Sequence, residues 1–177
     1  MPETKSLNLS GVAETLLLPL YNRAMESQRP DAILKDEKAV ELVMQMRLDF
    51  SRVKQIHMNE LLNAMRIIFT REIDRYARDF LARCPDAVVV HIGCGLDSRF
   101  ERVDNGQVEW YDLDFPDVIQ LRRNLLGDER ERYHLLACSV LQDAWLETVK
   151  VHSPRPILFL AEQFSSTSKK RRSSRWC

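Results

Sequence analysis

A short apolar run followed at once by two glycines is the feature that most constrains how this chain can fold. Residues 87–92 read Ala-Val-Val-Val-His-Ile, and Gly93-Cys94-Gly95 follows directly. A short run rich in β-branched side chains and bounded by glycine is typical of a strand buried on both faces of a parallel sheet. The sequence therefore predicts a central parallel strand that ends in a glycine-rich turn.

The chain beyond this strand alternates between strand-like and helix-like segments. Three further strands are expected at residues 108–113, 134–139 and 157–161, with helical stretches around 117–126 and 144–150. Strands that alternate with helices favour right-handed βαβ units and an open parallel sheet. The predicted fold class is therefore α/β, with about four strands.

The first part of the chain is predicted to be helical. Apolar residues recur at helical spacing between Leu16 and Ala24, and Asp36 is suited to cap a second helix. The clearest amphipathic helix ends at Cys84-Pro85. Its apolar face comprises Leu61, Met65, Ile68, Phe69, Ile73, Tyr76, Ala77 and Phe80.

Composition excludes several classes of function. The 177 residues carry 26 Lys and Arg against 26 Asp and Glu, so nothing global attracts the chain to nucleic acid. The apolar run Val12 to Leu20 is interrupted by Glu14 and Thr15, which predicts neither a secretory signal nor a membrane span. The cysteines, four in all, are scattered without metal-like spacing. We therefore expect free thiols, no bound metal and a cytoplasmic location.

Two patterns point to a ligand at the carboxyl ends of the strands. Gly93 and Gly95 let a ligand approach the backbone, although a tight strand-to-helix turn would also explain them. Asp114 ends the second strand, 19 residues after Gly95, close to the interval at which an acidic residue binds a nucleotide ribose. Its alternative role is to cap the helix that opens at Pro116. No third glycine follows Gly95, so a ligand without phosphates is favoured over a dinucleotide.

Three segments together resemble the family of leucine carboxyl methyltransferases and tetracenomycin-type polyketide O-methyltransferases. They are residues 90–99 (Val-His-Ile-Gly-Cys-Gly-Leu-Asp-Ser-Arg), 110–119 (Trp-Tyr-Asp-Leu-Asp-Phe-Pro-Asp-Val-Ile) and 159–162 (Phe-Leu-Ala-Glu). The resemblance covers roughly residues 8–162. It implies a Rossmann-like fold that binds S-adenosylmethionine and methylates an oxygen of a small molecule.

The resemblance also implies which residues bind the cofactor. Gly93 and Gly95 are expected near its methionine part, and Asp114 at its ribose. An arginine of the preceding helix typically meets the cofactor carboxylate, and the candidates are Arg66 and Arg71. Either arginine is equally well explained as a solvated helix residue.

Two further positions follow from the same resemblance. The stretch that contains Val140 and Leu141 occupies the place where the family covers the adenine, through a backbone amide. Glu162 matches an acidic family position that faces the cofactor, although a strand-end carboxylate in solvent is the simpler alternative. No general base stands out, and a carboxylate acceptor needs none because it is already ionised at neutral pH.

The predicted organisation has three parts. Residues 1–84 form an N-terminal helical lid region, residues 85–162 a partial Rossmann-like domain, and residues 163–177 a polar tail expected to be disordered. The family continues after Glu162 with glycine, a short apolar run and tyrosine. A reading frame displaced by two bases, with suitable synonymous codons, gives Val-Phe-Ile-Tyr there. The tail is therefore interpreted as a frameshift product, and the truncated chain is expected to be weakly active or inactive.

Two other functions stay open at this point. The first is an NAD-binding oxidoreductase fragment, which would bind NADH and not S-adenosylmethionine. The second is a non-enzymatic interaction module, which would bind neither. The identity of the methyl acceptor and the oligomeric state are left open by the sequence.

Overall fold

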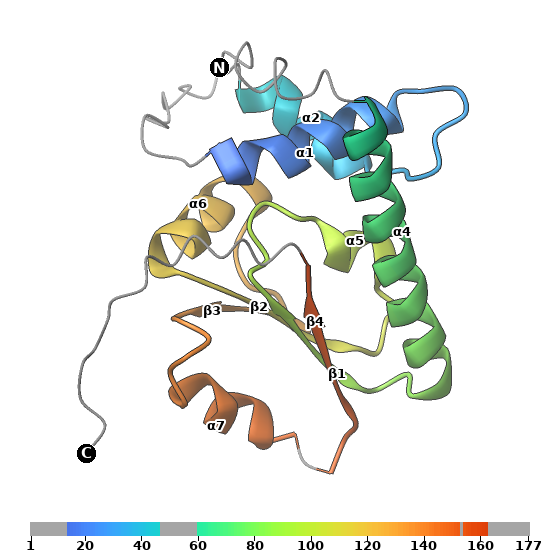
Figure 1. The fold of residues 1–177 in the computed structure, drawn as a ribbon. Helices are drawn as coiled ribbons and strands as arrows, with labels where there is room; N and C mark the ends of the chain where they lie inside the picture. Colours follow the sequence, from blue (N-terminus) through green and yellow to red (C-terminus); the bar gives the residue numbers. More distant parts are fainter. Residues whose placement is uncertain (1–13, 47–59, 153, 163–177) are drawn as a thin grey trace, which may run out of the picture.

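The computed structural model describes residues 14–46, 60–152 and 154–162. Its centre is a four-stranded parallel sheet in the order β3-β2-β1-β4 (Figure 1). The strands are β1 (Val88–Ile92), β2 (Glu109–Asp114), β3 (Tyr133–Ala137) and β4 (Ile157–Ala161). All four predicted strands and the α/β class are confirmed, with strand ends shifted by two residues at most.

Helices cover the sheet on both faces and along its carboxyl edge. They are α1 (Glu14–Ser27), α2 (Glu37–Met46), α4 (Glu60–Arg83), α5 (Arg99–Val103), α6 (Pro116–Leu126) and α7 (Ala144–Lys150). The predicted cap of α2 is confirmed, because Asp36 Oδ1 accepts a hydrogen bond from the Ala39 N–H at 3.0 Å. The one-turn helix α5 was not predicted, since five residues are too few to show a helical period.

Alternation along each strand divides the core between the two faces of the sheet. Val89 and Trp110 face α4, α5 and α6, where they pack with Ala77, Phe100 and Ile119. Val88, Val90, Tyr111 and Leu113 face α7 and pack with Trp145 and Val149. β1 therefore has no solvent-exposed face, which explains its uninterrupted apolar sequence.

The N-terminal helices pack across the carboxyl edge of the sheet (Figure 1). Leu20 and Ala24 of α1 and Leu42 of α2 form a core with Leu96, in the turn after β1, and Leu121 of α6. Helix α2 is thus joined to the sheet domain through apolar contacts. This packing places α1 directly beside the glycine-rich turn.

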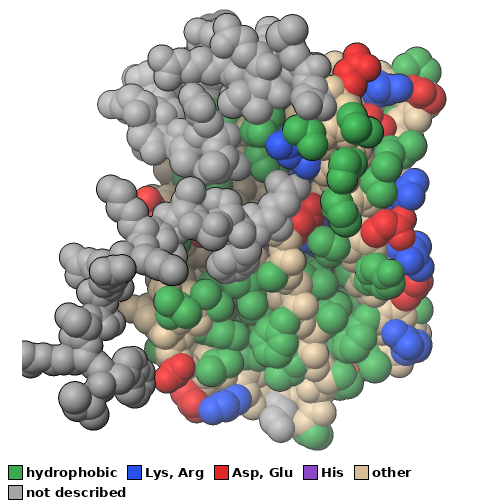
Figure 2. Space-filling view, viewed as in Figure 1, with side chains coloured by type: hydrophobic (Ala, Val, Ile, Leu, Met, Phe, Trp, Pro, Cys, Tyr) green, Lys and Arg blue, Asp and Glu red, His purple; other side chains and the backbone are tan. Residues whose placement is uncertain are grey.

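The apolar face predicted for α4 coincides only in part with the face that the helix buries. Ala77 is buried, and Ile73 and Phe80 are partly buried against the core, as predicted. The other buried residues, at regular helical spacing, are Asn63, Ile67, Thr70, Asp74 and Leu81. Leu61, Met65, Phe69 and Tyr76 are exposed, and so are Ile157 and Phe159 of β4. Figure 2 shows hydrophobic side chains gathered on this face of the molecule. The expectation was wrong for the exposed residues because the buried face of α4 also includes polar side chains, such as Thr70 and Asp74, that have buried or partly buried partners.

Candidate functional site

A cavity lies between the N-terminal helices and the carboxyl edge of the sheet. Strand order reverses between β1 and β4, and open α/β sheets bind ligands at such a point. The wall combines residues of α1, α4 and the segments that follow β1, β2 and β4. The lining residues are Leu16, Pro19, Asn22, Arg23, Arg66, Ile67, Thr70, His91, Gly93, Cys94, Gly95, Leu96, Asp97, Asp114, Phe115 and Glu162.

The glycine-rich turn forms one wall of this cavity. Gly93 has φ 67° and Gly95 has φ 50°, both in the left-handed region that favours glycine. A Cβ atom at Gly95 would lie 3.1 Å from Leu16 Cδ2. Glycine is therefore favoured at both positions by the backbone of the turn. At Gly95 it is also favoured by the limited space beside α1.

Asp114 lies at the end of β2, opposite the turn. Its Oδ2 accepts a hydrogen bond from the Gly95 N–H at 2.8 Å, and its Oδ1 accepts one from the Phe115 N–H at 2.8 Å. A carboxylate has about four acceptor positions, so two remain for a ligand. The alternative capping role is wrong, because Phe115 occupies the N-cap position of α6, which has no side-chain cap.

Glu162, directly after β4, also lines the cavity. Its Oε1 accepts a hydrogen bond from Thr70 Oγ1 at 2.7 Å, and its Oε2 is bound by Arg99 Nη2. The side chain is only 12% exposed. The simpler alternative of a strand-end carboxylate in solvent is therefore wrong.

The two arginine candidates on α4 occupy different surroundings. Arg66 lines the cavity, and its Nη1 donates to Asn63 Oδ1 at 3.1 Å. Arg71 lies outside the lining residues, is 43% exposed, and pairs with the neighbouring Glu72 at 2.9 Å. Only Arg66 is therefore placed to meet a ligand in this cavity.

Like Arg71, the predicted site residues Val140 and Leu141 do not line the cavity. Val140 packs against the apolar core on the α7 side of the sheet, and its carbonyl accepts a hydrogen bond from Trp145 Nε1 at 3.1 Å. The Leu141 side chain is 90% exposed. Their assignment to an adenine stays a prediction.

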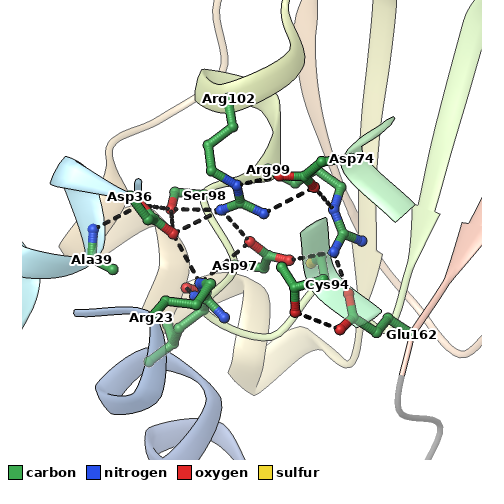
Figure 3. A network of polar contacts seen from close by, with 12 residues as sticks. Arg23, Asp36, Ala39, Asp74, Cys94, Asp97, Ser98, Arg99, Arg102 and Glu162 are labelled. Carbon is green, nitrogen blue, oxygen red and sulfur yellow. Dashed lines mark hydrogen bonds and ion pairs between the residues drawn. The ribbon is translucent and has the colours of Figure 1, made fainter. Parts of the chain in front are cut away.

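A buried network of charged groups lies beside the cavity (Figure 3). Arg102 Nη1 lies 2.7 Å from Asp36 Oδ2 and 2.9 Å from Asp97 Oδ1. Arg99 Nε lies 2.7 Å from Asp74 Oδ1. The members are Arg23, Asp36, Asp74, Asp97, Ser98, Arg99, Arg102 and Glu162.

Electrostatics hold this network in its ionised form. Burial raises the pKa of the Asp97 carboxyl, but Arg102, Arg23 and Arg99 outweigh burial and lower the pKa well below its usual value. The pKa of Asp36 is likewise lowered, against the effect of burial, by Arg23 and Arg102. The network therefore ties α1, α2, α4 and α5 to the turn after β1 at neutral pH.

A second buried network lies behind the first, inside the sheet. Asp112 Oδ2 accepts from Tyr133 Oη at 2.6 Å and from Arg122, while its Oδ1 accepts from Trp110 Nε1 at 2.9 Å. His91 joins the two networks, with Nδ1 3.1 Å from Asp112 Oδ1 and Nε2 3.2 Å from Arg99 Nη1. Because a guanidinium only donates, His91 Nε2 is the acceptor in its contact with Arg99.

Apart from Glu162, the residues of these networks were missed as site residues by sequence reasoning. The signal was the charged stretch after Gly95, in which Asp97 and Arg99 look like surface residues although Arg99 is fully buried. The second signal was the set of polar residues, including Thr70 and Asp74, at the buried spacing of α4. Neither signal identifies which charges pair, because the partners lie far apart in the chain.

The parallel sheet, its strand order and the cavity at the reversal point define a Rossmann-like α/β protein. A family model described as leucine carboxyl methyltransferase matches residues 17–163. The chain belongs to this family. In the described ranges, no helix is long and apolar enough to cross a membrane.

Two curated proteins are similar to the chain over most of its length. Tetracenomycin polyketide synthesis O-methyltransferase TcmP of Streptomyces glaucescens is 43% identical over 161 residues, which are 89% of this chain and 57% of that protein. S-adenosyl-L-methionine-dependent methyltransferase dpfgK of Gibberella zeae is 33% identical over 167 residues, 88% of this chain and 56% of that protein. The chain thus spans a little more than half the length of these relatives.

Proposed function

We propose that the cavity binds S-adenosylmethionine and that the chain derives from an O-methyltransferase acting on a carboxylate or phenol oxygen of a small, polyketide-type molecule. The observation that carries the proposal is the pairing of Asp114 with the Gly95 amide at the edge of the cavity. Family membership and the printed names of TcmP and dpfgK support it.

Each proposed contact uses a group that the cavity presents. The backbone at Gly93 and Gly95 approaches the methionine part, since both glycines have a positive φ and a Cβ atom at Gly95 would lie 3.1 Å from Leu16 Cδ2. The two remaining acceptor positions of Asp114 suit the two hydroxyls of a ribose. Arg66 binds the carboxylate of the amino-acid part, and Glu162, which also lines the cavity, accepts its ammonium group.

The charge of the cavity also fits this cofactor. Its ionised lining residues are the carboxylates Asp97, Asp114 and Glu162 against two guanidinium groups, Arg23 and Arg66. An excess of negative charge attracts a cationic ligand and repels a pyrophosphate. The alternative of an NAD-binding oxidoreductase is therefore disfavoured.

The bound cofactor supplies an electrophilic methyl group on its sulfonium. The protein's contribution is to hold the donor and exclude water, and to orient the acceptor oxygen, an effect that can supply roughly 7 to 11 kcal/mol. In the described part, α1 contributes Leu16, Pro19, Asn22 and Arg23 to the cavity wall. This supports the proposed division into an N-terminal lid region, residues 1–84, and a partial sheet domain, residues 85–162.

A cytoplasmic location completes the proposal. Cys84, Cys94 and Cys138 are free thiols, as in proteins of a reducing compartment. The proposed polar tail, residues 163–177, lies outside the described residues. Its interpretation as a frameshift product, with weak or absent activity in this chain, stays a prediction that sequencing the gene across Glu162 tests.

Thermal unfolding with two ligands tests the proposed function. At about 100-fold excess over the dissociation constant, S-adenosylhomocysteine should raise Tm by roughly 5 °C or more, and NADH at the same concentration should leave Tm unchanged. A shift with NADH alone would favour the oxidoreductase. A folded chain that responds to neither ligand would favour a non-enzymatic interaction module.

A further inference from the structure

Glu162 is one of three members of the charged network that line the cavity, together with Arg23 and Asp97 (Figure 3). Three guanidinium groups and four carboxylates make up the network, and its fourth carboxylate, Glu162, is the one at the end of β4. The network thus has one carboxylate more than it has guanidinium groups, and Glu162 presents a carboxylate at the cavity wall to a cation that enters it.

Two residues fix the direction of the Glu162 carboxylate. Thr70 Oγ1, from α4, donates to Oε1 at 2.7 Å, and Arg99 Nη2, from α5, binds Oε2. One donor on each oxygen leaves further acceptor positions on both. The carboxylate is thus restrained from two sides and still able to accept hydrogen bonds.

Arg99 is itself held in place. Its Nε lies 2.7 Å from Asp74 Oδ1, and its Nη1 lies 3.2 Å from His91 Nε2. The Arg99 side chain is fully buried, so the guanidinium cannot reorient into solvent. A glutamate held against such a fixed group loses little conformational freedom when a ligand binds.

We propose that Thr70 and Arg99 are positioning residues that hold the Glu162 carboxylate in the orientation in which it accepts the ammonium group of the ligand's amino-acid part. This inference rests on the proposed function, because it assumes an S-adenosyl amino acid in the cavity. Arg99 does not line the cavity, whereas Thr70 does. Both act through Glu162.

The test compares two ligands and one isosteric variant. Thr70→Val removes the hydroxyl that binds Glu162 and keeps the volume of the buried side chain. The ligands are S-adenosylhomocysteine and its deaminated analogue, in which hydrogen replaces the amino group. In calorimetric titrations of the whole chain, Thr70→Val should weaken S-adenosylhomocysteine about tenfold and the analogue less than about twofold.

Two control variants separate positioning from general damage. Thr70→Ser restores the hydroxyl and should return the affinity for S-adenosylhomocysteine to within about threefold of the parent chain. Thr148→Val makes the same chemical change at an exposed position of α7 and should alter neither affinity. An equal loss for both ligands in Thr70→Val, or no loss for either, would overturn the proposal.

Arg99→Lys provides an independent measurement on the second contact. Lysine keeps the charge but cannot bind Asp74 and Glu162 with the geometry of the guanidinium. We expect the same selective loss for S-adenosylhomocysteine, and no additional loss when Arg99→Lys is combined with Glu162→Gln. Additive losses would contradict action through Glu162. Failure of the parent chain to bind either ligand would instead refute the proposed function.

Discussion

The backbone N–H of Gly95 donates a hydrogen bond to Asp114 Oδ2 at 2.8 Å, which joins the turn after β1 to the end of β2. The carboxylate lines the cavity, and its Oδ1 also accepts a hydrogen bond from the Phe115 N–H at the start of α6. A change at either residue therefore alters both walls of the proposed cofactor site. The buried network around Asp112 can be tested through the stability of the chain, and the cavity residues can be tested through ligand binding.

Tyr133→Phe should destabilise the chain by about 1 to 3 kcal/mol. The substitution removes the hydroxyl that donates to Asp112 Oδ2 at 2.6 Å and accepts from Arg122 Nη2 at 2.9 Å. Both partners are buried and would lose a hydrogen bond without gaining water. Urea unfolding measures the change, with Tyr76→Phe, at a residue that is 62% exposed, as the matched control. Equal stabilities of the two variants would contradict the structure of this network.

Stability should fall in acid through Asp112. Burial raises the pKa of this carboxyl, but Arg122 and the hydrogen bond from His91 outweigh burial and lower the pKa from 3.8 to about 2. Because the folded pKa lies below the unfolded one, the stabilisation of roughly 2 kcal/mol is complete above about pH 4 and is lost as the pH falls toward 2. The free energy of unfolding, measured by urea titration at successive pH values, should decline over this window. A profile that stays level from pH 5 to pH 2 would exclude the assigned pKa.

Arg66→Ala should weaken binding of S-adenosylhomocysteine, whereas Arg71→Ala should not. Arg66 lines the cavity, while Arg71 is paired with Glu72 outside it. Loss of a hydrogen bond to a charged group corresponds to roughly 1.5 to 3 kcal/mol, or a factor of ten or more in affinity. 5′-Methylthioadenosine, which lacks the amino-acid part, should bind both variants equally. A larger effect of Arg71→Ala would reverse the assignment.

Phe159→Lys should reduce self-association of the chain. In the described residues β4 pairs only with β1, and Phe159 is 51% exposed beside the exposed Ile157. An apolar edge strand can pair with a strand of another chain. A lysine on the edge strand opposes this pairing. Sedimentation velocity over a range of concentrations measures the effect. Val151→Lys, at a residue that is 75% exposed but outside β4, should leave association unchanged.

The fold was largely predictable because each strand of the sheet has its own local signal. The β-branched run at Val88–Ile92 and the glycines after it identify β1 from sequence alone, since both faces of that strand are buried. The orientation of α4 was not predictable in this way. Asp74 is buried because Arg99 and Arg102 pair with it, and these partners lie 25 and 28 residues further along the chain.

The candidate site was predictable where its chemistry follows a strand end. Gly93, Gly95 and Asp114 were found because parallel strands bring their carboxyl ends to one edge. The contacts of Glu162 were not, because Thr70 and Arg99 lie 92 and 63 residues away from it in sequence. Only the folded structure shows that residues of α4 and α5 converge on this carboxylate.

Binding of the cofactor at the cavity is tested by calorimetric titration of the purified chain with S-adenosylhomocysteine. The titration is repeated with Asp114→Asn. Asp117→Asn, at an exposed position in the first turn of α6, is the matched control. We expect saturable binding by the parent chain and by Asp117→Asn. Asp114→Asn should lower the affinity for S-adenosylhomocysteine about tenfold or more. No binding by a folded parent chain, or equal binding by Asp114→Asn, would contradict a cofactor site at this cavity.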